Sequence, residues 1–405
     1  MTVIVLCLLM AGVLPALNII DKRPATVKKA MQHAVTYLHA NIKNTGQFVY
    51  RRNLVSGQVD ATRYNILRHA GTIYALADYY QDHPISSSER KNLEFASDFL
   101  ISCCLAPLPD QPDIRSLWSY PDLTGGDHNP KVKLGAAGLA LSALTLSRKV
   151  GSELDVEAVL RDLGRFLDYM QEPTGRFVSR YNPSRGGKDD TWTSLYYPGE
   201  AALGLYYLYE HTGNLNWLRM SVDALRYLSR SRESLDNLPP DHWALIATAK
   251  LLHLDDSIMA AVLPDGLEWQ SKDGSNSVYK SLLDHAYKIV ESILSDQQQR
   301  PENLCLGGGF DPTGRVAPTA TRLEGLLAAL KFVEHGELRT QIVAAAETGI
   351  DFLLRAQIQS GSQRGAFTRI NPLCNSSHRR AAEIRIDYVQ HALSAMLMYQ
   401  RFWAN

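Results

Sequence analysis

The chain has no excess of charge of either sign and no segment that would divide it. Lysine and arginine together number 42, as do aspartate and glutamate. Such a balance creates no long-range field that would attract nucleic acid or an anionic membrane. No linker rich in proline, glycine and serine interrupts the 405 residues, 45% of which are hydrophobic. The composition therefore predicts one large domain with a sizeable core, and it argues against nucleic-acid binding.

Cysteine is also scarce, and several cofactor-binding patterns are missing. None of the five cysteines has zinc-finger or Cys-x-x-Cys spacing, and no phosphate-binding loop, dinucleotide-binding fingerprint or serine-nucleophile elbow is present. We therefore expect neither a metal nor an organic cofactor. Adjacent Cys103 and Cys104 are expected to serve packing. Cys305 and Cys374 fall in loops predicted to lie at the same end of the molecule. They could form a disulfide in an oxidising compartment, although free thiols fit the sequence equally well.

The first residues differ from the rest. Val3 to Leu17 is a run of apolar residues, glycine and proline. Its length suits the core of a signal peptide better than a transmembrane helix. No lysine or arginine precedes it and no small-x-small cleavage site follows, so a buried helix or an uncleaved anchor is the alternative. We expect residues 1–21 to be a signal peptide or hydrophobic segment and residues 22–405 a single catalytic domain. The protein would then be periplasmic or secreted, with membrane contact only through an uncleaved segment.

A repeat of about 64 residues runs through the remaining chain. Six stretches of small and apolar residues each begin with a polar or ionisable cluster, and they open at Arg68, Leu134, Tyr197, Pro240, Arg322 and Tyr388. Within them, Ala136 to Leu146 and Leu323 to Val333 are apolar on every side, which is typical of a helix buried all round.

Amphipathic segments alternate with these buried ones. They span residues 30–42, 89–105, 156–171, 216–229, 279–294 and 338–357. Their apolar residues recur at helical spacing among charged ones. Six outer helices would thus alternate with six inner helices. The sequence predicts an all-α fold, an (α/α)6 toroid of six helical hairpins, with an open solenoid as the alternative.

In such a ring the inner helices all run the same way, so their N-termini gather at one end. Their free amide groups carry partial positive charge and favour carboxylates or anions. The connecting loops there should line a common cavity and form short β-hairpins. A Gly-x-Phe sequence recurs in four of them, at Gly46, Gly175, Gly308 and Gly365, and indicates a turn followed by a buried aromatic plug.

Aromatic and ionisable residues crowd the same loops and helix starts. Tryptophan and tyrosine stack on sugar rings, and arginine binds hydroxyls and carboxylates in a fixed fork geometry. The predicted substrate contacts are Tyr64, Arg68, His69, Trp118, Tyr120, Arg180, Trp192, Tyr196, Trp243, Arg322, Arg385 and His391. Arg68 could instead pair with an internal aspartate, and His391 could be a core histidine held by Asp387.

In this arrangement the chain resembles the superfamily of six-hairpin toroids. That superfamily includes glycoside hydrolases, unsaturated-uronyl hydrolases, sugar 2-epimerases and the toroidal domains of polysaccharide lyases. The resemblance covers roughly Ala25 to Trp403 and is one of architecture. It implies a carbohydrate-active protein whose partner is a polysaccharide or oligosaccharide, acidic ones included.

A glycoside hydrolase is the reaction we favour from the sequence. It requires two carboxyl groups, one protonated as general acid and one ionised as base or nucleophile. Glu200 and Asp387 are the predicted pair, with Asp190 and Asp241 as substitutes. Any of them could instead cap a helix or pair with an arginine, and Asp241 in particular suits an N-cap.

Other reactions fit the same cavity. A polysaccharide lyase would use arginines to neutralise a uronate and Tyr196 or His391 to take its proton. A sugar epimerase would need two facing histidines, either His69 and His391 or His242 and His391. A glycan-binding protein or scaffold without catalysis is the remaining alternative.

Overall fold

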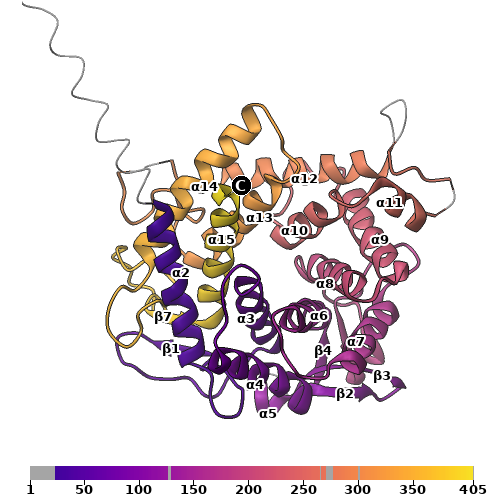
Figure 1. The fold of residues 1–405 in the computed structure, drawn as a ribbon, viewed down its shortest axis with the longest axis horizontal. Helices are drawn as coiled ribbons and strands as arrows, with labels where there is room; N and C mark the ends of the chain where they lie inside the picture. The colour runs from indigo at the N-terminus through magenta and orange to yellow at the C-terminus, as the bar shows by residue number, and fades with distance from the viewer. Residues whose placement is uncertain (1–22, 126–128, 265, 271–276, 300–301, 405) are drawn as a thin grey trace, which may run out of the picture.

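The computed structural model describes residues 23–125, 129–264, 266–270, 277–299 and 302–404, and the hydrophobic N-terminal segment lies outside them. The inner helices are α3 (Ile66–Tyr79), α6 (Leu134–Lys149), α8 (Tyr197–Thr212), α10 (His242–Leu251), α13 (Val316–Ala329) and α15 (Ile386–Ala404). Each contacts the next, and α15 returns to contact α3, so the inner helices form a closed ring (Figure 1). The structure therefore confirms the toroid and excludes the open solenoid.

An outer helix packs against each inner one. The outer helices are α2 (Arg23–Ala40), α4 (Ser87–Cys104), α7 (Glu157–Met170), α9 (Leu215–Ser231), α12 (Val278–Ser295) and α14 (Glu337–Ala356). In that order they contact α15, α3, α6, α8, α10 and α13. Two shorter helices lie in connections, α5 (Pro121–Thr124) and α11 (Asp256–Val262). None of the described helices combines the length and the apolarity needed to cross a bilayer.

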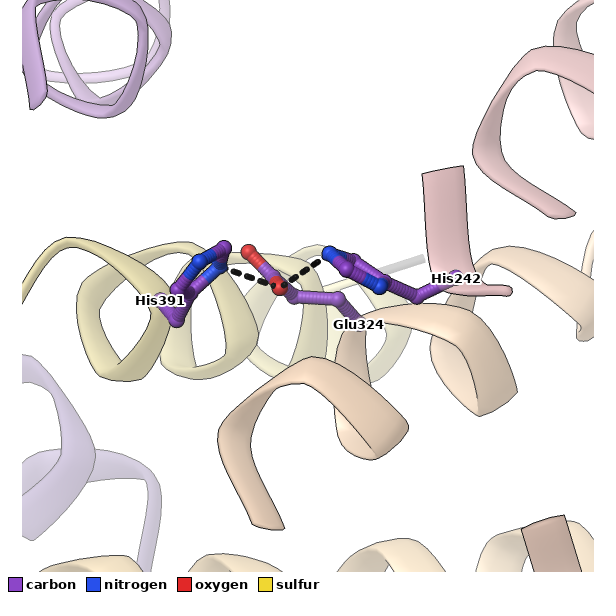
Figure 2. A group of neighbouring side chains, drawn as sticks. All are labelled: His242, Glu324 and His391. Carbon is purple, nitrogen blue, oxygen red and sulfur yellow. Dashed lines mark hydrogen bonds and ion pairs between the residues drawn. The ribbon is translucent and has the colours of Figure 1, made fainter. Parts of the chain in front are cut away.

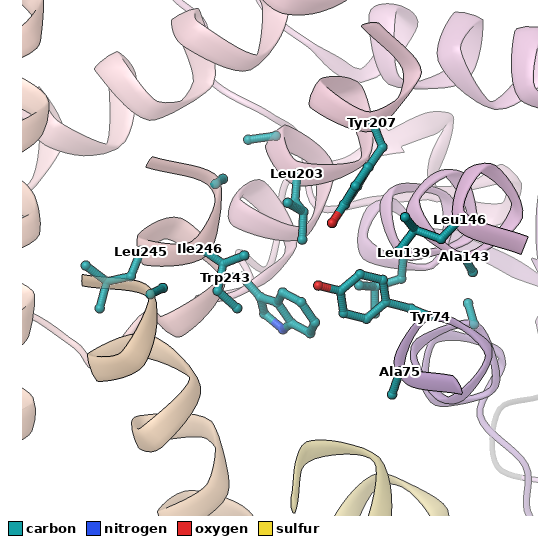
Figure 3. Packing of buried hydrophobic residues seen from close by; sticks show 14 of the residues in the cluster. Tyr74, Ala75, Leu139, Ala143, Leu146, Leu203, Tyr207, Trp243, Leu245 and Ile246 are labelled. Atoms are coloured by element: carbon teal, nitrogen blue, oxygen red, sulfur yellow. The ribbon is translucent and has the colours of Figure 1, made fainter. Parts of the chain in front are cut away.

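The inner ring has an aromatic centre. Tyr74, Tyr207 and Trp243 come from three inner helices, and all are buried (Figure 3). The ring of Tyr74 lies 5.8 Å from that of Trp243 and 6.3 Å from that of Tyr207, both in edge-to-face contact. Burying an aromatic side chain of this size contributes roughly 1.5–3 kcal/mol. Tyr74 and Tyr207 lie within the stretches that predicted inner helices, whereas Trp243 was predicted as a substrate contact and is buried here in the ring.

The Gly-x-Phe turns hold neighbouring outer helices together. Their glycines have φ values of 80°, 87°, 79° and 91° in chain order. A Cβ atom on any of them would lie 2.0–2.3 Å from a backbone oxygen of another outer helix, since Gly46 faces α4, Gly175 faces α9, Gly308 faces α14 and Gly365 faces α2. The following phenylalanines, Phe48, Phe177, Phe310 and Phe367, are buried. The predicted turn and aromatic plug are confirmed.

A glutamine just after the outer helix strengthens three of these contacts. Gln171 donates to the carbonyl of Met220 at 2.9 Å, and Gln297 donates to that of Ala345 at 2.8 Å. Gln357 donates at 2.8 Å to a carbonyl of α2, and this bond helps to close the ring between its last and first outer helices.

Short antiparallel sheets cover the end at which the inner helices begin. One sheet pairs β1 (Arg51–Asn53) with β7 (Glu383–Arg385). The other contains β2 (Leu105–Leu108), β3 (Gln111–Ser119), β4 (Lys131–Lys133), β5 (Arg180–Asn182) and β6 (Gly187–Asp189) in that order. The predicted β-hairpin loops are therefore present at the cavity end.

A disulfide joins two loops at this end. Cys305 and Cys374 are bonded, with their Cα atoms 4.8 Å apart. The bond links the loop after α12 to the loop before β7, so the structure selects the bridged alternative over free thiols. Cys103 is exposed and Cys104 is buried, and both are free.

We expect Gly365→Ala to destabilise the ring more than Gly361→Ala. Both glycines have positive φ, but only a Cβ at position 365 meets backbone, at 2.0 Å, while that at 361 meets open space. Gly361→Ala should lower the free energy of unfolding by about 1–2 kcal/mol through backbone strain. Gly365→Ala should lower it by more than about 3 kcal/mol because overpacking adds to that strain. Urea unfolding of the two variants measures the difference, and equal losses would contradict the contact.

Candidate active site

A cavity of about 450 Å³ opens where the inner helices begin. Side chains from α3, α8, α10, α13 and α15 line it, as the shared orientation of these helices predicts. The predicted site residues that reach it are Arg68, Tyr196, Glu200, Trp243, Arg322, Arg385, Asp387 and His391.

Three residues at one side of the cavity form a connected group. His242, Glu324 and His391 come from the consecutive inner helices α10, α13 and α15 (Figure 2). His391 Nδ1 lies 2.8 Å from Glu324 Oε2, and His242 Nε2 lies 3.7 Å from the same oxygen. The two imidazole centroids are 5.5 Å apart. One buried carboxylate therefore stands between two histidines.

The environment shifts the pKa values of the two histidines in opposite directions. Burial, assisted by the charges of His391 and Arg322, lowers the pKa of His242 well below its ordinary value. Burial also opposes the charged form of His391, but the Glu324 carboxylate outweighs it and raises the pKa of His391. Burial raises the pKa of Glu324 as well, against the opposing charge of His391. His391 therefore holds a proton more readily than a free histidine does, and His242 holds one less readily.

Some polar atoms in this group have no partner. Among the described residues, neither nitrogen of buried His242 has a hydrogen-bond partner. Buried polar atoms are almost always hydrogen-bonded, and His242 lines the cavity, so its ring nitrogens are available to a ligand or to water.

The same three residues could also hold a metal ion. Their donor atoms lie within 4.8 Å of one another, and two histidines with one carboxylate are a known ligand set for zinc and iron. However, the 2.8 Å contact between His391 and Glu324 is a charge-assisted hydrogen bond whose proton a metal would have to replace. The hydrogen-bonded group and a metal site are therefore alternative states of the same three residues.

Asp387 is held as an anion by two arginines. Arg385 donates to both of its oxygens, at 2.6 and 2.8 Å, and Arg68 Nε lies 3.0 Å away. Burial alone would raise the pKa of Asp387, but the two guanidinium groups outweigh it and hold the pKa at about 2. Because it is so firmly paired, Asp387 is a weak base.

Glu200 has the opposite character. Burial, together with the charge of Asp241, raises the pKa of Glu200 to about 8, and the opposing charges of Arg68 and Lys133 are too weak to prevent this. Its Oε2 atom has no hydrogen-bond partner among the described residues. Glu200 is therefore a neutral carboxylic acid at the cavity wall.

The two substitute carboxylates lie elsewhere. Asp241 is buried beneath the cavity, where it caps α10 by accepting a bond from Ala244 N at 3.1 Å and pairs with Arg232 at 2.9 Å. Its side chain turns back to the helix start, as an N-cap requires. Asp190 is exposed and pairs with Arg176.

His69 and Tyr64 belong to the core. His69 hydrogen-bonds the carbonyl of Ala96 at 2.8 Å and the hydroxyl of Tyr64 at 2.5 Å, and so fastens α3 to α4. Successive helix residues point about 100° apart, so when Arg68 faces the cavity, His69 faces the outer helix. Neither residue lines the cavity, so the prediction that they contact substrate is wrong for this cavity.

Four predicted contacts lie near the five-stranded sheet and do not line the cavity. Trp118 is buried, and its indole donates to a backbone carbonyl of β2. Tyr120 stacks on Trp118. Arg180 pairs with Asp189 at 2.7 Å and lies over the ring of Trp192, which is 45% exposed. These aromatic side chains pack the sheet and its edge.

Several residues of the cavity wall are not among the predicted substrate contacts. They are Asn65, Tyr197, Arg315, Arg369, Tyr388 and Gln390. Sequence reasoning also treated His242 only as one member of a histidine pair and did not connect Glu324 to either histidine. The available signal was position, because most of these residues lie at or within two turns of the start of an inner helix.

Comparison with known proteins places the fold. No family model matches the chain, and no curated protein does so either. Solved structures do match it. A D-mannose isomerase aligns at 12% identity with a TM-score of 0.65, covering 93% of this chain and 97% of that one. A cellobiose 2-epimerase from Spirochaeta thermophila aligns at 12% identity with a TM-score of 0.62, covering 97% of this chain and 100% of that one. A GH76 α-mannanase from Bacteroides thetaiotaomicron aligns at 12% identity with a TM-score of 0.59, covering 94% of this chain and 97% of that one.

The chain has the (α/α)6 toroid fold. At this level of identity the likeness establishes the architecture over nearly the whole chain, and the chemistry has to be argued from the site itself.

We expect Glu200→Gln to stabilise the protein at alkaline pH. Between pH 4 and pH 8 the folded state keeps a proton that the unfolded chain releases, because the pKa of Glu200 rises from 4.5 to about 8 on folding. The contribution of this proton to the free energy of unfolding is fully present below pH 4.5 and is lost as pH rises through 8. By pH 8 the wild-type free energy of unfolding has fallen by on the order of 4 kcal/mol, and the glutamine variant avoids this fall.

Urea unfolding at pH 4 and pH 8 measures this effect. The difference between variant and wild type should grow with pH, whereas the exposed control Glu153→Gln should show no such trend. A constant difference for Glu200→Gln would mean that Glu200 is ionised in the folded protein.

Proposed function

We propose that this protein is a carbohydrate-active enzyme, a sugar isomerase or epimerase that transfers protons at the carbon next to the carbonyl group. The observation that carries the proposal is a pair of histidines that line the cavity and flank one buried carboxylate, Glu324, with pKa values shifted in opposite directions. Solved toroids of the same fold include a D-mannose isomerase and a cellobiose 2-epimerase, which supports this chemistry.

The two histidines supply a base and an acid. Neutral His242 takes the proton from C2 of an open-chain aldose, and the electron pair of that C–H bond forms a double bond between C1 and C2. His391 donates its proton to O1, and an enediol results. Return of the first proton to C1, with the O2 proton passing back to His391, gives the ketose. For the epimer, the enediol turns in the cavity so that His242 returns its proton to the opposite face of C2, and O1 passes its proton back to His391 as the C1 carbonyl re-forms.

Glu324 prepares the acid. Its carboxylate stabilises the imidazolium of His391, and its distance of 3.7 Å from His242 lets it pass protons between the two rings as the enzyme resets. The donor atoms of all three residues lie within 4.8 Å of one another, so neighbouring atoms of one sugar can meet both histidines.

A glycoside hydrolase is the second candidate. Glu200 supports it, because a neutral carboxylic acid with a raised pKa is suited to general-acid catalysis. The other carboxylate that lines the cavity is Asp387, whose two arginine partners make it a poor base. The hydrolase therefore has an acid without an effective partner.

The proposed location is the periplasm or the extracellular space. The Cys305–Cys374 disulfide supports it, because disulfides persist in oxidising compartments and are rare in the cytosol.

We expect His242→Gln and His391→Gln to reduce sugar isomerisation by roughly 10²–10⁴-fold, because each removes a proton-transfer group. Purified protein would be incubated with common aldoses and ketoses in deuterated water, and nuclear magnetic resonance would record product formation and deuterium at C2. His253→Gln, an exposed histidine just beyond the end of α10, is the matched control and should retain activity.

Each negative result has a distinct meaning. New reducing ends from a polysaccharide without C2 deuteration would instead support the hydrolase. Full isomerase activity in either histidine variant would remove the proposed mechanism.

We expect prolonged treatment with EDTA to leave isomerisation unchanged. The proton shared by His391 and Glu324 provides the acid directly, so the reaction needs no metal. Activity before and after dialysis, with zinc or manganese added back, tests this. A loss that a metal restores would reassign the three residues as metal ligands.

A further inference from the structure

Arginine is the dominant charged residue of the cavity wall. Five arginines line the cavity, and they come from α3, from α13 and the residue before it, from β7 and from the loop before β7. They are Arg68, Arg315, Arg322, Arg369 and Arg385.

Two of these arginines are neutralised individually. Arg315 pairs with Asp311 at 2.7 Å, and Arg322 pairs with Asp296 at 3.0 Å. These pairs fix the guanidinium groups at the rim while leaving no net charge there.

A second pair of arginines shares one carboxylate. Arg68 and Arg385 both contact Asp387, at 3.0 and 2.6 Å. A single negative charge faces two positive ones, so one positive charge remains.

Arg369 has no carboxylate partner among the described residues. Its guanidinium hydrogen-bonds the neutral Tyr388 hydroxyl, while its Nε atom is buried and has no hydrogen-bond partner in the same set. A buried, unpartnered donor on a cation is costly, since such groups are normally satisfied. An anionic ligand would therefore gain the most binding free energy by contacting Arg369.

The remaining ionisable groups do not offset this excess. Burial keeps Glu200 neutral at pH 7, and Glu324 lies against His391 and His242 and not against the arginines. Arg68, Arg385 and Arg369 together therefore exceed the single charge of Asp387 by two positive charges.

The excess charge is held in place by covalent and backbone links. Residues 315 and 370 form an isolated β-bridge, and Val316 N donates to the carbonyl of Arg369 at 3.1 Å. The Cys305–Cys374 disulfide joins the two loops that precede and follow this bridge. Arg315 and Arg369 therefore start from a fixed, shared backbone position, which suits a preorganised site.

We propose that the cavity binds sugars that carry an oxyanion group, a carboxylate or a phosphate, at the end remote from the carbonyl carbon, with Arg369 as the principal contact. The assignment of a sugar rests on the function proposed above. The anion preference rests on the arginines alone, because a guanidinium fork binds either oxyanion in a bidentate manner.

Calorimetry on the full-length protein tests the preference, with glucuronate, glucose 6-phosphate and glucose as probes. At least one anionic sugar should bind roughly 10- to 100-fold more tightly than glucose, and Arg369→Gln should remove most of that advantage. Arg364→Gln is the matched control, because this arginine is exposed, lies five residues earlier in the same loop and does not line the cavity. The control should keep the preference.

The two anionic sugars separate the sources of the oxyanion, since preference for glucuronate indicates a uronate and preference for glucose 6-phosphate indicates a sugar phosphate. Equal binding of all three sugars, binding of none of them, or an unchanged preference in Arg369→Gln would overturn the proposal. Sugar isomerisation is measured separately and tests the proposed isomerase or epimerase function. Anion binding without conversion of any sugar would support the anion site and contradict the proposed isomerase activity. Conversion of a sugar without a preference for anions would support the isomerase and contradict the anion site.

Discussion

The architecture depends on close contact between the loops after the outer helices and the backbone of neighbouring outer helices. At four places a glycine with positive φ lies where any Cβ would meet a backbone oxygen at 2.0–2.3 Å. Three glutamine amides add hydrogen bonds to the same neighbours. Because the glycine contacts bring backbone against backbone, they set the spacing of the outer ring with little dependence on side-chain adjustments. The inner helices inherit that spacing, and so do the residues at their first turns.

The cavity combines two kinds of electrostatic environment at short range. On one side, Glu324 and His391 form a nearly self-neutralising group beside an uncharged His242. On the other, Asp387 satisfies two arginines only in part. Burying charges without complete pairing lowers stability, so a structure that keeps such an arrangement indicates a functional requirement. The neutral side is suited to moving protons, and the cationic side is suited to holding an anion.

Much of the fold could be predicted from the sequence because burial leaves a clear pattern. Helices that are apolar all round, such as Ala136 to Leu146, can only lie inside, and their alternation with amphipathic segments specifies a double ring. The Gly-x-Phe repeats correctly indicated turns with buried plugs. The glutamine contacts were not predictable, because each depends on a helix more than forty residues away in the chain.

The site could be predicted only in part, because the sequence does not show in which direction a helical side chain points. The prediction that the inner helices begin at one end correctly placed Arg68, Glu200 and Asp387 at the cavity. That prediction could not decide which of two adjacent residues faces inward, and a rotation of about 100° separates Arg68 from His69. Nor could it show that Glu324 lies between two histidines, since that depends on the relative rotation of three helices. The positions of loop residues such as Asp190 depend on the neighbouring sheet, and the helical repeat in the sequence does not predict that sheet.

The pairing of α2 with α15 has a consequence for how the protein is made. The two helices lie side by side in the ring but stand at opposite ends of the described chain (Figure 1). The face of α2 that packs on α15 is covered only when α15, the last described helix, has been made. Contacts between distant parts of a chain form slowly, and exposed apolar surface promotes aggregation in the meantime. Closure of the ring is therefore a late step in folding, and it depends on the contact between the first and last described helices.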